Sequence, residues 1–428
     1  MHYARNPEVV IRREHFGGIA FNKANGTLIE LDREACIFFE QLDGETSLQN
    51  IGKQIQDELN VNVSIPRLYD VAESLIGNGF ICKGVKSYHI IAEDFPEQKD
   101  YLSAPESVHL AVTHRCNYHC TSCYVDDSVT EEMTTTEIKN LIDEMADMKV
   151  FQLAIGGGEP FLRDDLVDIV RYARLKGIVP NITTNGSLLT SEIAEQLSGH
   201  IGQIQISVNG HNRSLHESFR QTESFDNALI VMKILREQKI KFGINVLLSK
   251  DNLREIEQII SFAAKQGAST INFLRPKPSK SESNWYERAR LSENDYKTVQ
   301  ESLKNVLGNY HIKITIDCAL SFLMNSESPD DLQKHGVYGC SGARRFLSIH
   351  PDGNTYPCSF IDSYYGGNIK NGLKGVWEGF NEFRELQVTG KCGVCNISKF
   401  CAGCKAILLY ETNDILSQKQ GCFIKKST

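Results

Sequence analysis

Apolar and polar positions follow two different rhythms along this chain, and the first 90 residues contain both. The stretch FGGIAFNKANGTLIELD alternates around Asn25 and Gly26, which predicts a β-hairpin. The stretches REACIFFEQLDG, SLQNIGKQIQDELN and SIPRLYDVAESLIGNG instead have helical spacing of apolar residues, and FICK can return as a strand. The pattern therefore predicts a small α+β domain, which shows no obvious catalytic constellation.

The pattern changes after residues 91–106, a polar segment with two prolines that is expected to be a linker. Six apolar runs then predict strands: SVHLAV, FQLAIG, IVPNIT, QIQISV, FGINVLL and TINFL. Helices fit between them, and Thr134 and Glu137 form a capping-box pattern at the start of one. Short loops between alternating strands and helices imply parallel strands joined by right-handed crossovers.

Six β/α units favour an α/β fold with a partial, TIM-like (β/α)6 barrel over a complete eight-stranded barrel. A doubly wound open sheet is the structural alternative. The rest of the chain is rich in turn residues and cysteines. We therefore expect a first domain at 1–90, a linker at 91–106, the barrel at 107–310 and a cysteine-rich module at 311–428.

Charge and cysteine usage narrow the function. With 46 Lys and Arg against 54 Asp and Glu, the net charge is −8, so the basic surface of a nucleic-acid-binding protein is not expected. No segment reads as a signal peptide or a membrane span, so we expect a cytoplasmic protein, in which disulfides are rare. Of the 13 cysteines, Cys36 and Cys82 stand alone and the others cluster after residue 115, which indicates metal binding.

The first cysteine group follows the first barrel strand, in THRCNYHCTSCYVDD. Cys116, Cys120 and Cys123 have the spacing C-x3-C-x2-C, and three thiolates on one loop can hold three irons of a [4Fe–4S] cubane. Without a fourth cysteine nearby, one iron stays open to bind a small molecule. A zinc site is the alternative, but structural zinc usually takes four ligands, and His114 or His119 would have to complete it.

The following strands also end in glycine or polar residues, and ligands collect at the carboxyl ends of parallel strands. Strand two ends in AIGGGEP, whose glycines allow close backbone approach and whose carboxylate can hold an ammonium group. Strands three to six end in ITTNG, ISVNG, LLSKDN and LRP. The residues expected on this rim are Gly157, Gly158, Glu159, Thr184, Asn185, Ser207, Asn209 and Arg275.

A second group of cysteines lies in the C-terminal module, with the core spacing C-x2-C-x5-C-x2-C. Its members are Cys340, Cys358, Cys392, Cys395, Cys401, Cys404 and Cys422. Seven thiolates exceed one site, so two metal sites are expected. Spacing alone supports two structural zinc ions about as well as two iron–sulfur clusters.

The cysteine triad followed by GGEP, TTNG and SVNG resembles the radical S-adenosylmethionine (SAM) superfamily over residues 107–276. The resemblance implies that the triad binds a [4Fe–4S] cluster, whose open iron is chelated by the amino and carboxylate groups of SAM. Reductive cleavage of SAM would then give a 5′-deoxyadenosyl radical that abstracts hydrogen from carbon. The family often has an aromatic residue before the last cysteine, whereas this chain has Ser122, with Tyr124 just after the cysteine.

The same resemblance assigns the SAM contacts. The GGEP motif would meet the SAM amino group, the SVNG motif would lie near the ribose, and the arginine after strand six would meet the carboxylate. The implied cofactor-binding residues are Gly157, Gly158, Glu159, Asn185, Ser207, Asn209 and Arg275.

The C-terminal module resembles SPASM, the twin-cluster extension of many peptide-modifying radical SAM enzymes. The family order places Cys392, Cys395, Cys401 and Cys422 on a distal auxiliary [4Fe–4S] cluster, and Cys340, Cys358 and Cys404 on a proximal one. The family more often has three residues between the last close pair, where this chain has two. Cys318 is a candidate fourth proximal ligand, with a buried small hydrophobe as the alternative, and an open proximal iron could instead bind the substrate.

The first 90 residues resemble the winged-helix domains that capture leader peptides in ribosomal peptide biosynthesis by adding a strand to a sheet edge. A merely stabilising domain is the alternative. The combined resemblance implies a radical SAM oxidoreductase that modifies a precursor peptide by a carbon–carbon, thioether or ether crosslink, or by epimerisation. Its partners would be that peptide and a low-potential electron donor such as flavodoxin or ferredoxin, with no nucleic acid or membrane.

Three other classes of protein remain open. One is a radical SAM enzyme that acts on a folded protein, as sulfatase-maturing enzymes do, or on a small molecule. The second is a non-catalytic zinc-binding interaction protein, against which the GGEP motif and the polar strand ends argue. The third is an enzyme that modifies DNA or RNA, against which the acidic charge balance and the lack of a basic aromatic tract argue.

Overall fold

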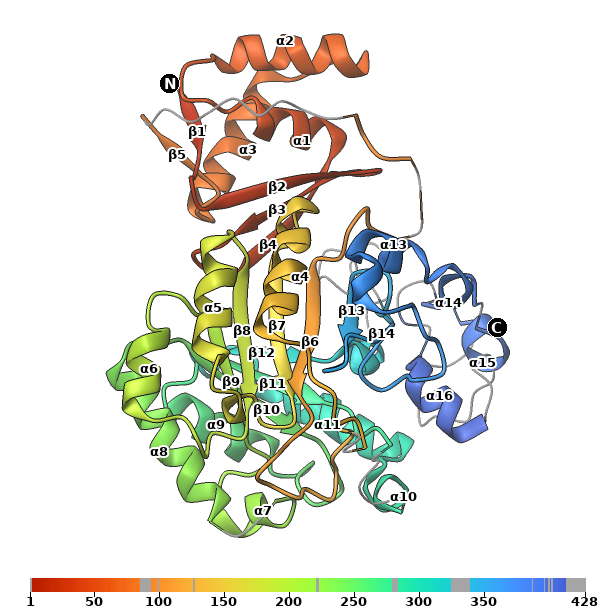
Figure 1. Cartoon of the computed structure of the whole chain (residues 1–428). Helices are drawn as coiled ribbons and strands as arrows, with labels where there is room; N and C mark the ends of the chain where they lie inside the picture. The colour runs from red at the N-terminus through yellow and green to blue at the C-terminus, as the bar shows by residue number, and fades with distance from the viewer. Residues whose placement is uncertain are drawn as a thin grey trace.

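The computed structural model describes residues 2–84, 94–97, 99, 101–125, 128–220, 223–278, 284–324, 339–386, 388–395, 397–398, 401 and 403–412. A domain built from the first of these ranges lies at one end of a large sheet, and the C-terminal elements lie beside that sheet (Figure 1). Among the helices in these ranges, none is long and apolar enough to cross a membrane.

The N-terminal domain combines two small antiparallel sheets with three helices. The sheet of β2, β3 and β4 contains the predicted hairpin between β3 and β4, and β1 pairs with β5, the predicted returning strand. The apolar faces of the helices pack against the strands in one core, which confirms the α+β fold expected here. The elements are β1 (Tyr3–Arg5), β2 (Val9–Glu14), β3 (Gly17–Asn22), β4 (Thr27–Asp32), α1 (Arg33–Glu40), α2 (Leu48–Leu59), α3 (Ile65–Gly77) and β5 (Ile81–Lys83).

The central sheet has the strand order β12-β11-β10-β9-β8-β7-β6-β13-β14, and only β13 and β14 pair antiparallel. The six predicted strands are β6 to β11, and they lie side by side in chain order, without the reversal of a doubly wound sheet, so the predicted partial barrel is confirmed. The strands are β6 (Ser107–Thr113), β7 (Gln152–Gly157), β8 (Val179–Thr184), β9 (Gln203–Ser207), β10 (Phe242–Leu247), β11 (Thr270–Leu274), β12 (Lys313–Ile316), β13 (Phe346–Ile349) and β14 (Thr355–Tyr356).

Helices connect the strands and cover the outside of the sheet (Figure 1). Thr134 and Glu137 form the predicted capping box of the first one. These helices are α4 (Thr135–Asp147), η1 (Pro160–Leu162), α5 (Leu166–Leu175), α6 (Ser191–Leu197), α7 (Arg213–Glu217), α8 (Ser224–Glu237), α9 (Ile256–Lys265), α10 (Trp285–Ala289) and α11 (Glu293–Val306).

The central sheet continues past the boundary expected at residue 310. Both β12 and β13 come from the segment expected to form the cysteine-rich module, and they pair with the two outer strands of the six-unit barrel. Pairing satisfies backbone groups that open sheet edges would leave free. The remaining elements are η2 (Cys318–Met324), η3 (Ile369–Asn371), α13 (Leu373–Glu378), α14 (Asn381–Glu385), α15 (Gly390–Gly393) and α16 (Lys405–Thr412).

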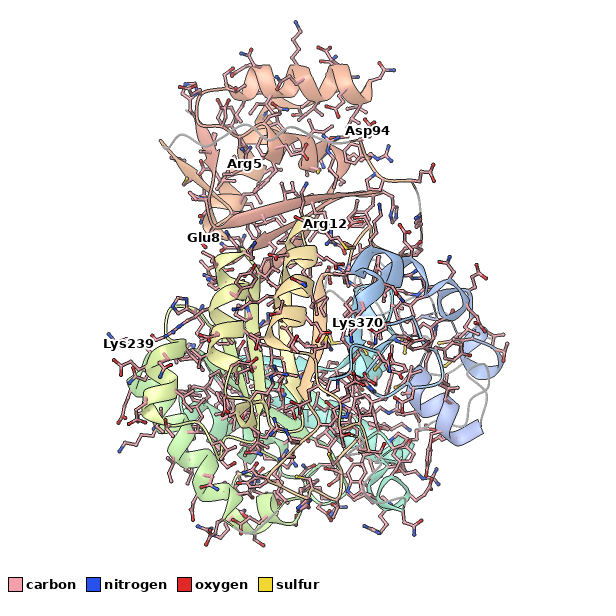
Figure 2. All side chains as sticks on the ribbon, viewed as in Figure 1. Arg5, Glu8, Arg12, Asp94, Lys239 and Lys370 are labelled. Atoms are coloured by element: carbon pink, nitrogen blue, oxygen red, sulfur yellow. The ribbon has the colours of Figure 1, made fainter. Side chains whose placement is uncertain are left out.

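The N-terminal domain is fixed to the amino ends of the barrel strands. Phe21 of β3 stacks on Phe151, the residue before β7, with ring centroids 5.3 Å apart. Leu102 from the expected linker and Val179 at the start of β8 join this apolar cluster. Arg12 lies at the same junction (Figure 2), and its guanidinium donates to three backbone oxygens that precede β6 and β7. The carboxyl ends of the strands therefore face away from this domain.

Candidate functional site

A pocket of about 400 Å³ lies at the carboxyl ends of the barrel strands, at the opposite end of the barrel from the N-terminal domain. The structure brings the cysteine triad, the glycines of the GGEP motif and the polar ends of the other strands together in this one cavity. The predicted residues that line it are Cys116, Cys120, Cys123, Gly157, Gly158, Thr184, Asn185, Ser207, Asn209 and Arg275.

The glycines of the GGEP motif let the end of β7 lie against the segment that leads into Cys116. The N–H of Gly158 donates to the oxygen of Thr113 at 2.8 Å. A Cβ atom on Gly158 would lie 2.1 Å from the oxygen of Arg115, and Gly157 has a φ of +117°, which L-residues rarely adopt. The close approach thus requires both glycines, and it places the cysteine loop on the rim of the pocket.

The sulfur atoms of two predicted cluster ligands already receive polar contacts. The backbone N–H of Tyr118 donates to Cys116 Sγ at 3.4 Å, and Asn185 Nδ2 lies 4.0 Å from the same sulfur. Arg220 Nη1 lies 3.6 Å from Cys120 Sγ. Burial raises the pKa of the Cys116 thiol, and the Tyr118 N–H opposes that rise. The Tyr118 N–H thus favours negative charge on the Cys116 sulfur, which metal binding requires.

Three residues that line the pocket each have a buried donor without a partner within the described ranges, namely Asn209 Nδ2, Arg220 Nε and Arg275 Nε. The rest of Asn209 is fixed, because its Oδ1 accepts from the Leu247 N–H at 2.9 Å and its own N–H donates to His216 Nδ1 at 3.3 Å. A buried donor without an acceptor costs about 1–3 kcal/mol. The residues present therefore fit a ligand with acceptor oxygens, such as the carboxylate and ribose hydroxyls of SAM.

Arg220 was not among the residues predicted from the sequence. It lies in the loop after α7, and no local pattern in ESFRQT distinguishes it from a surface arginine. Only the fold brings its guanidinium to the cysteine loop.

Glu159 lies behind the glycine rim, where it is fully buried. Its oxygens accept hydrogen bonds from Thr184 Oγ1 at 2.7 Å and the Asn185 N–H at 2.9 Å. Burial raises the pKa of this carboxyl, and the two hydrogen bonds oppose the rise. Glu159 thus ties the end of β7 to the end of β8, and its contact with the SAM amino group stays a prediction.

Arg275 directly follows β11, and its guanidinium contacts residues of α11 and η2. It lies over the rings of Tyr296 and Phe322, 5.1 and 5.3 Å from their centroids, and Nη1 donates to the oxygen of Ala319 at 3.1 Å. Its Nε is buried without a partner in the described part of the chain. The predicted contact with the SAM carboxylate stays a prediction.

In the part of the chain that the structure describes, no three His, Cys, Asp or Glu side chains converge as ligands of a single metal ion. This finding does not bear on a cubane, in which each thiolate binds a different iron. Of the two histidines that could complete a zinc site, His114 lines the pocket and packs edge-on against His350 at 5.2 Å, and His119 is exposed.

Four cysteines from distant parts of the chain lie together beside the pocket. The pKa of the Cys358 thiol is raised to about 12, first by burial and then by Cys340 and Cys404. Surrounding protein atoms and Asp317 raise the pKa of the Cys318 thiol, and Cys340 and Cys404 again add to the shift, although Cys318 keeps an exposed surface. Cys318, the candidate fourth ligand, thus lies within electrostatic reach of Cys340 and Cys404, and joint ligation of a cluster by the four cysteines stays a prediction.

The cysteines predicted for the distal cluster are described in part. Cys392 lies in α15, Cys395 follows that helix, and Cys392 and Cys401 are buried. Cys422 lies outside the described residues. Their joint ligation of a cluster stays a prediction.

Comparison with known proteins gives matches over both cysteine-containing parts. The model of the radical SAM superfamily matches residues 110–263, and that of SPASM, an iron–sulfur cluster-binding domain, matches residues 340–405. The AdoMet-dependent heme synthase of Methanosarcina barkeri is 29% identical over 76% of this chain and 97% of its own length. The mycofactocin maturase MftC of Mycolicibacterium smegmatis is 30% identical over 71% of this chain and 78% of its own length.

A solved structure extends the match to the N-terminal domain. Streptococcus suis SuiB, solved bound to its precursor peptide SuiA, has a TM-score of 0.73 at 17% sequence identity. The superposition covers 98% of this chain and 100% of that one, so the whole domain arrangement is shared as a fold.

Proposed function

Because this chain belongs to the radical SAM superfamily and carries a SPASM domain, we propose that it is a peptide maturase. It would bind the leader of a ribosomally made precursor peptide and modify that peptide by crosslinking or epimerisation. Its cofactors are SAM and [4Fe–4S] clusters, one of which binds SAM. When bound, this pair supplies a carbon-centred radical that abstracts hydrogen from an unactivated carbon.

Different residues of the pocket would bind the cluster and SAM. Cys116, Cys120 and Cys123 would hold the SAM-binding cluster, with the glycine rim fixing their loop. Asn209 and Arg220 would donate to acceptor oxygens of SAM, because both line this cavity and each has a buried donor without a partner in the described ranges. The apolar and aromatic walls would exclude water from the radical.

The observation that favours a peptide substrate is the N-terminal domain. Among the described residues, strand β4 pairs with β3 alone, and the residues from Thr27 to Glu30 are exposed or half-buried. An open, accessible strand edge can accept an extended peptide by adding a strand. SuiB, which has this domain arrangement, was solved with a precursor peptide.

A small molecule is the second candidate substrate. The match to an AdoMet-dependent heme synthase, over 76% of this chain and 97% of that protein, favours it. A maturase of a folded protein is a third class that uses the same chemistry. The N-terminal domain distinguishes the peptide hypothesis from both, because neither needs a leader-binding edge.

We also propose a cytoplasmic location and a flavodoxin- or ferredoxin-like electron donor. Free cysteines that must stay reduced for cluster assembly are maintained in that compartment. Cleavage of SAM needs a low-potential electron, and such carriers supply it.

The first test is anaerobic reconstitution with iron and sulfide, followed by dithionite and SAM. We expect about twelve irons per chain, which corresponds to three cubanes, and formation of 5′-deoxyadenosine. The Cys116→Ala/Cys120→Ala/Cys123→Ala variant should lose about four irons and all 5′-deoxyadenosine, whereas Cys82→Ala, in the N-terminal domain, should lose neither. Zinc alone without 5′-deoxyadenosine would contradict the proposal.

The second test uses a synthetic peptide encoded by a short reading frame beside the gene. Amide hydrogen exchange of the full chain should slow at residues 27–32 when the whole precursor is added, but not when its leader is removed. A crosslinked product would lack two hydrogen atoms by mass spectrometry, whereas epimerisation in D2O would exchange one hydrogen for deuterium. Normal 5′-deoxyadenosine formation without peptide binding would redirect the search to small molecules.

A further inference from the structure

A buried ion pair lies in the wall between the SAM pocket and the four-cysteine group of Cys318, Cys340, Cys358 and Cys404. Lys277 follows the end of β11, and Asp317 follows the end of β12. Lys277 Nζ lies 2.5 Å from Asp317 Oδ2, and the two side chains are 10% and 13% exposed. Adjacent parallel strands thus carry opposite charges at the same rim.

The ion pair lies near residues that neighbour both predicted cluster sites. Lys277 lines the pocket, and its Nζ lies 4.8 Å from the ring centroid of Phe360, two residues after Cys358. Phe360 packs on Tyr124, the residue after Cys123, with centroids 4.4 Å apart.

On the other side, Asp317 directly precedes Cys318 in the chain. Lys277 lowers the pKa of the Cys358 and Cys404 thiols, while Asp317 raises that of Cys318. The ammonium group and the carboxylate therefore act in opposite directions on the same group of sulfurs.

A buried ion pair adds little to the stability of a fold. Taking two charges out of water costs several kcal/mol per ion, and apolar residues of similar size often give equal or better stability. Asp317 Oδ1 also has no hydrogen-bond partner among the described residues. A role in electrostatics explains why the charges are placed here.

We propose that Lys277 and Asp317 set the reduction potential of an iron–sulfur cluster held by Cys318, Cys340, Cys358 and Cys404. Reduction adds one negative charge to a cluster, so a nearby ammonium group favours the reduced form and a nearby carboxylate disfavours it. The proposal rests on the proposed function, because it requires the auxiliary cluster, and it makes both residues positioning residues rather than catalytic ones.

The two charges predict shifts of opposite sign. Lys277→Met should lower the reduction potential of this cluster, with about a tenfold smaller equilibrium constant for one-electron reduction, or 59 mV. Asp317→Asn should raise the potential by a similar factor. The Lys277→Met/Asp317→Asn variant should return close to the unsubstituted value, and Lys277→Arg should change it least.

The measurement is a redox titration followed by electron paramagnetic resonance, on the full chain reconstituted anaerobically. All variants would be made in the Cys116→Ala/Cys120→Ala/Cys123→Ala background, which removes the signal of the SAM-binding cluster. The distal auxiliary cluster serves as an internal control, because its potential should stay constant. Iron content is measured in each sample.

Opposite shifts that cancel in the double variant would support the proposal, because a loss of packing would not produce opposite signs. Shifts of the same sign, or less than twofold changes at full iron content, would overturn it and leave the proposed function intact. Failure of the unsubstituted chain to bind iron at these four cysteines would overturn both. If Asp317→Asn loses iron, Lys277→Met against Lys277→Arg still decides between charge and packing.

Discussion

Single side chains at the pocket are held by contacts that the linear sequence does not reveal. The guanidinium of Arg220 lies beside Cys120. Its charge adds to the lowering of the pKa of His216 by burial, and it opposes the rise that burial causes in the pKa of Glu159. The side chain thus stands where the cysteine loop, the GGEP rim and the SVNG turn meet. At this scale, charge and buried polar groups dominate the energetics.

We expect Arg220→Met to lower the rate of 5′-deoxyadenosine formation at least about tenfold, because one lost charged hydrogen bond is worth roughly 1.5–3 kcal/mol. The iron content should remain close to that of the unsubstituted chain, since the three thiols are intact. Arg220→Lys should retain part of the rate, and Arg254→Met, at an exposed position, should retain all of it. An unchanged rate and an unchanged KM for SAM in Arg220→Met would exclude the role.

His216 makes stability depend on pH. Burial, followed by the charge of Arg220, lowers its pKa to about 3, whereas an unfolded histidine titrates near 6.5. The unfolded chain therefore binds a proton that the folded chain does not, so stability is complete above about pH 6.5 and falls as the pH decreases. The expected loss is about 1.4 kcal/mol per pH unit.

The His216→Asn variant tests this prediction, because an amide oxygen can accept the Asn209 N–H without titrating. Its Tm should fall less between pH 7.5 and 5.5 than that of the unsubstituted chain. His311→Asn, at an exposed position, is the control and should show the full slope. Equal slopes for all three proteins would show that His216 is not the source.

At the scale of elements, the junction between the first sheet and the barrel contains a buried cation. Arg12 of β2 is 5% exposed, and its Nε donates to Glu14 at 2.8 Å. The Glu14 carboxylate in turn accepts from the N–H and hydroxyl of Ser103. Strand β2 is thus linked to the segment that leads into β6.

We expect Arg12→Met to lower the free energy of unfolding by about 3–5 kcal/mol, because it leaves the buried Glu14 carboxylate without its cation. The Arg12→Met/Glu14→Leu variant should recover part of that loss, since no charge then remains buried. Thermal unfolding of the reconstituted chain would measure both.

Arg174→Met is the matched control for this prediction. Arg174 crosses the same junction to Glu8 at 3.9 Å, but both side chains are partly exposed, so the expected loss is about 0–1 kcal/mol. A loss in Arg12→Met as small as in this control would contradict the assigned role.

At the scale of the whole molecule, the proposed leader site and the pocket for SAM lie at opposite ends of the barrel. The N-terminal domain packs on residues that precede β7 and start β8, whereas the pocket is lined by residues at the ends of the same strands. Strand β6 has 7 residues, which corresponds to roughly 23 Å at about 3.3 Å per residue. A leader bound at β4 therefore cannot lie beside the residue that is modified.

This arrangement predicts a minimum spacing in the precursor. An extended chain covers about 3.3–3.6 Å per residue, so at least about seven residues must separate the bound leader from the modified residue. Shorter precursors should keep their affinity, measured by fluorescence anisotropy, but lose modification, measured by mass spectrometry. Insertion of a few Gly and Ser residues should be tolerated, because longer loops cost little entropy.

Modification of a precursor with no spacer would contradict simultaneous binding at both ends of the barrel. It would also remove the main argument for a leader site on β4. A truncated precursor that loses both affinity and modification would instead place the deleted residues within the leader site.

The sequence by itself determined the elements and the chemistry of the first site. The alternation of apolar residues predicted β6 to β11 and the N-terminal hairpin, because a strand buried on one or both faces must repeat its apolar positions locally. The cysteine spacing and the glycines of GGEP likewise allowed the first site to be predicted from the sequence. Both reflect local constraints, namely a short loop that holds several irons and a backbone approach that a Cβ atom would block.

Only the tertiary structure decided which distant residues meet. Arg220 beside Cys120, Cys318 beside Cys340 and Cys404, and the pair of Lys277 and Asp317 all depend on how strands neighbour one another in the sheet. The same holds for β12 and β13, which extend the barrel beyond the boundary expected from the sequence. Contacts of this kind join residues far apart in the chain, and no local periodicity or spacing encodes them.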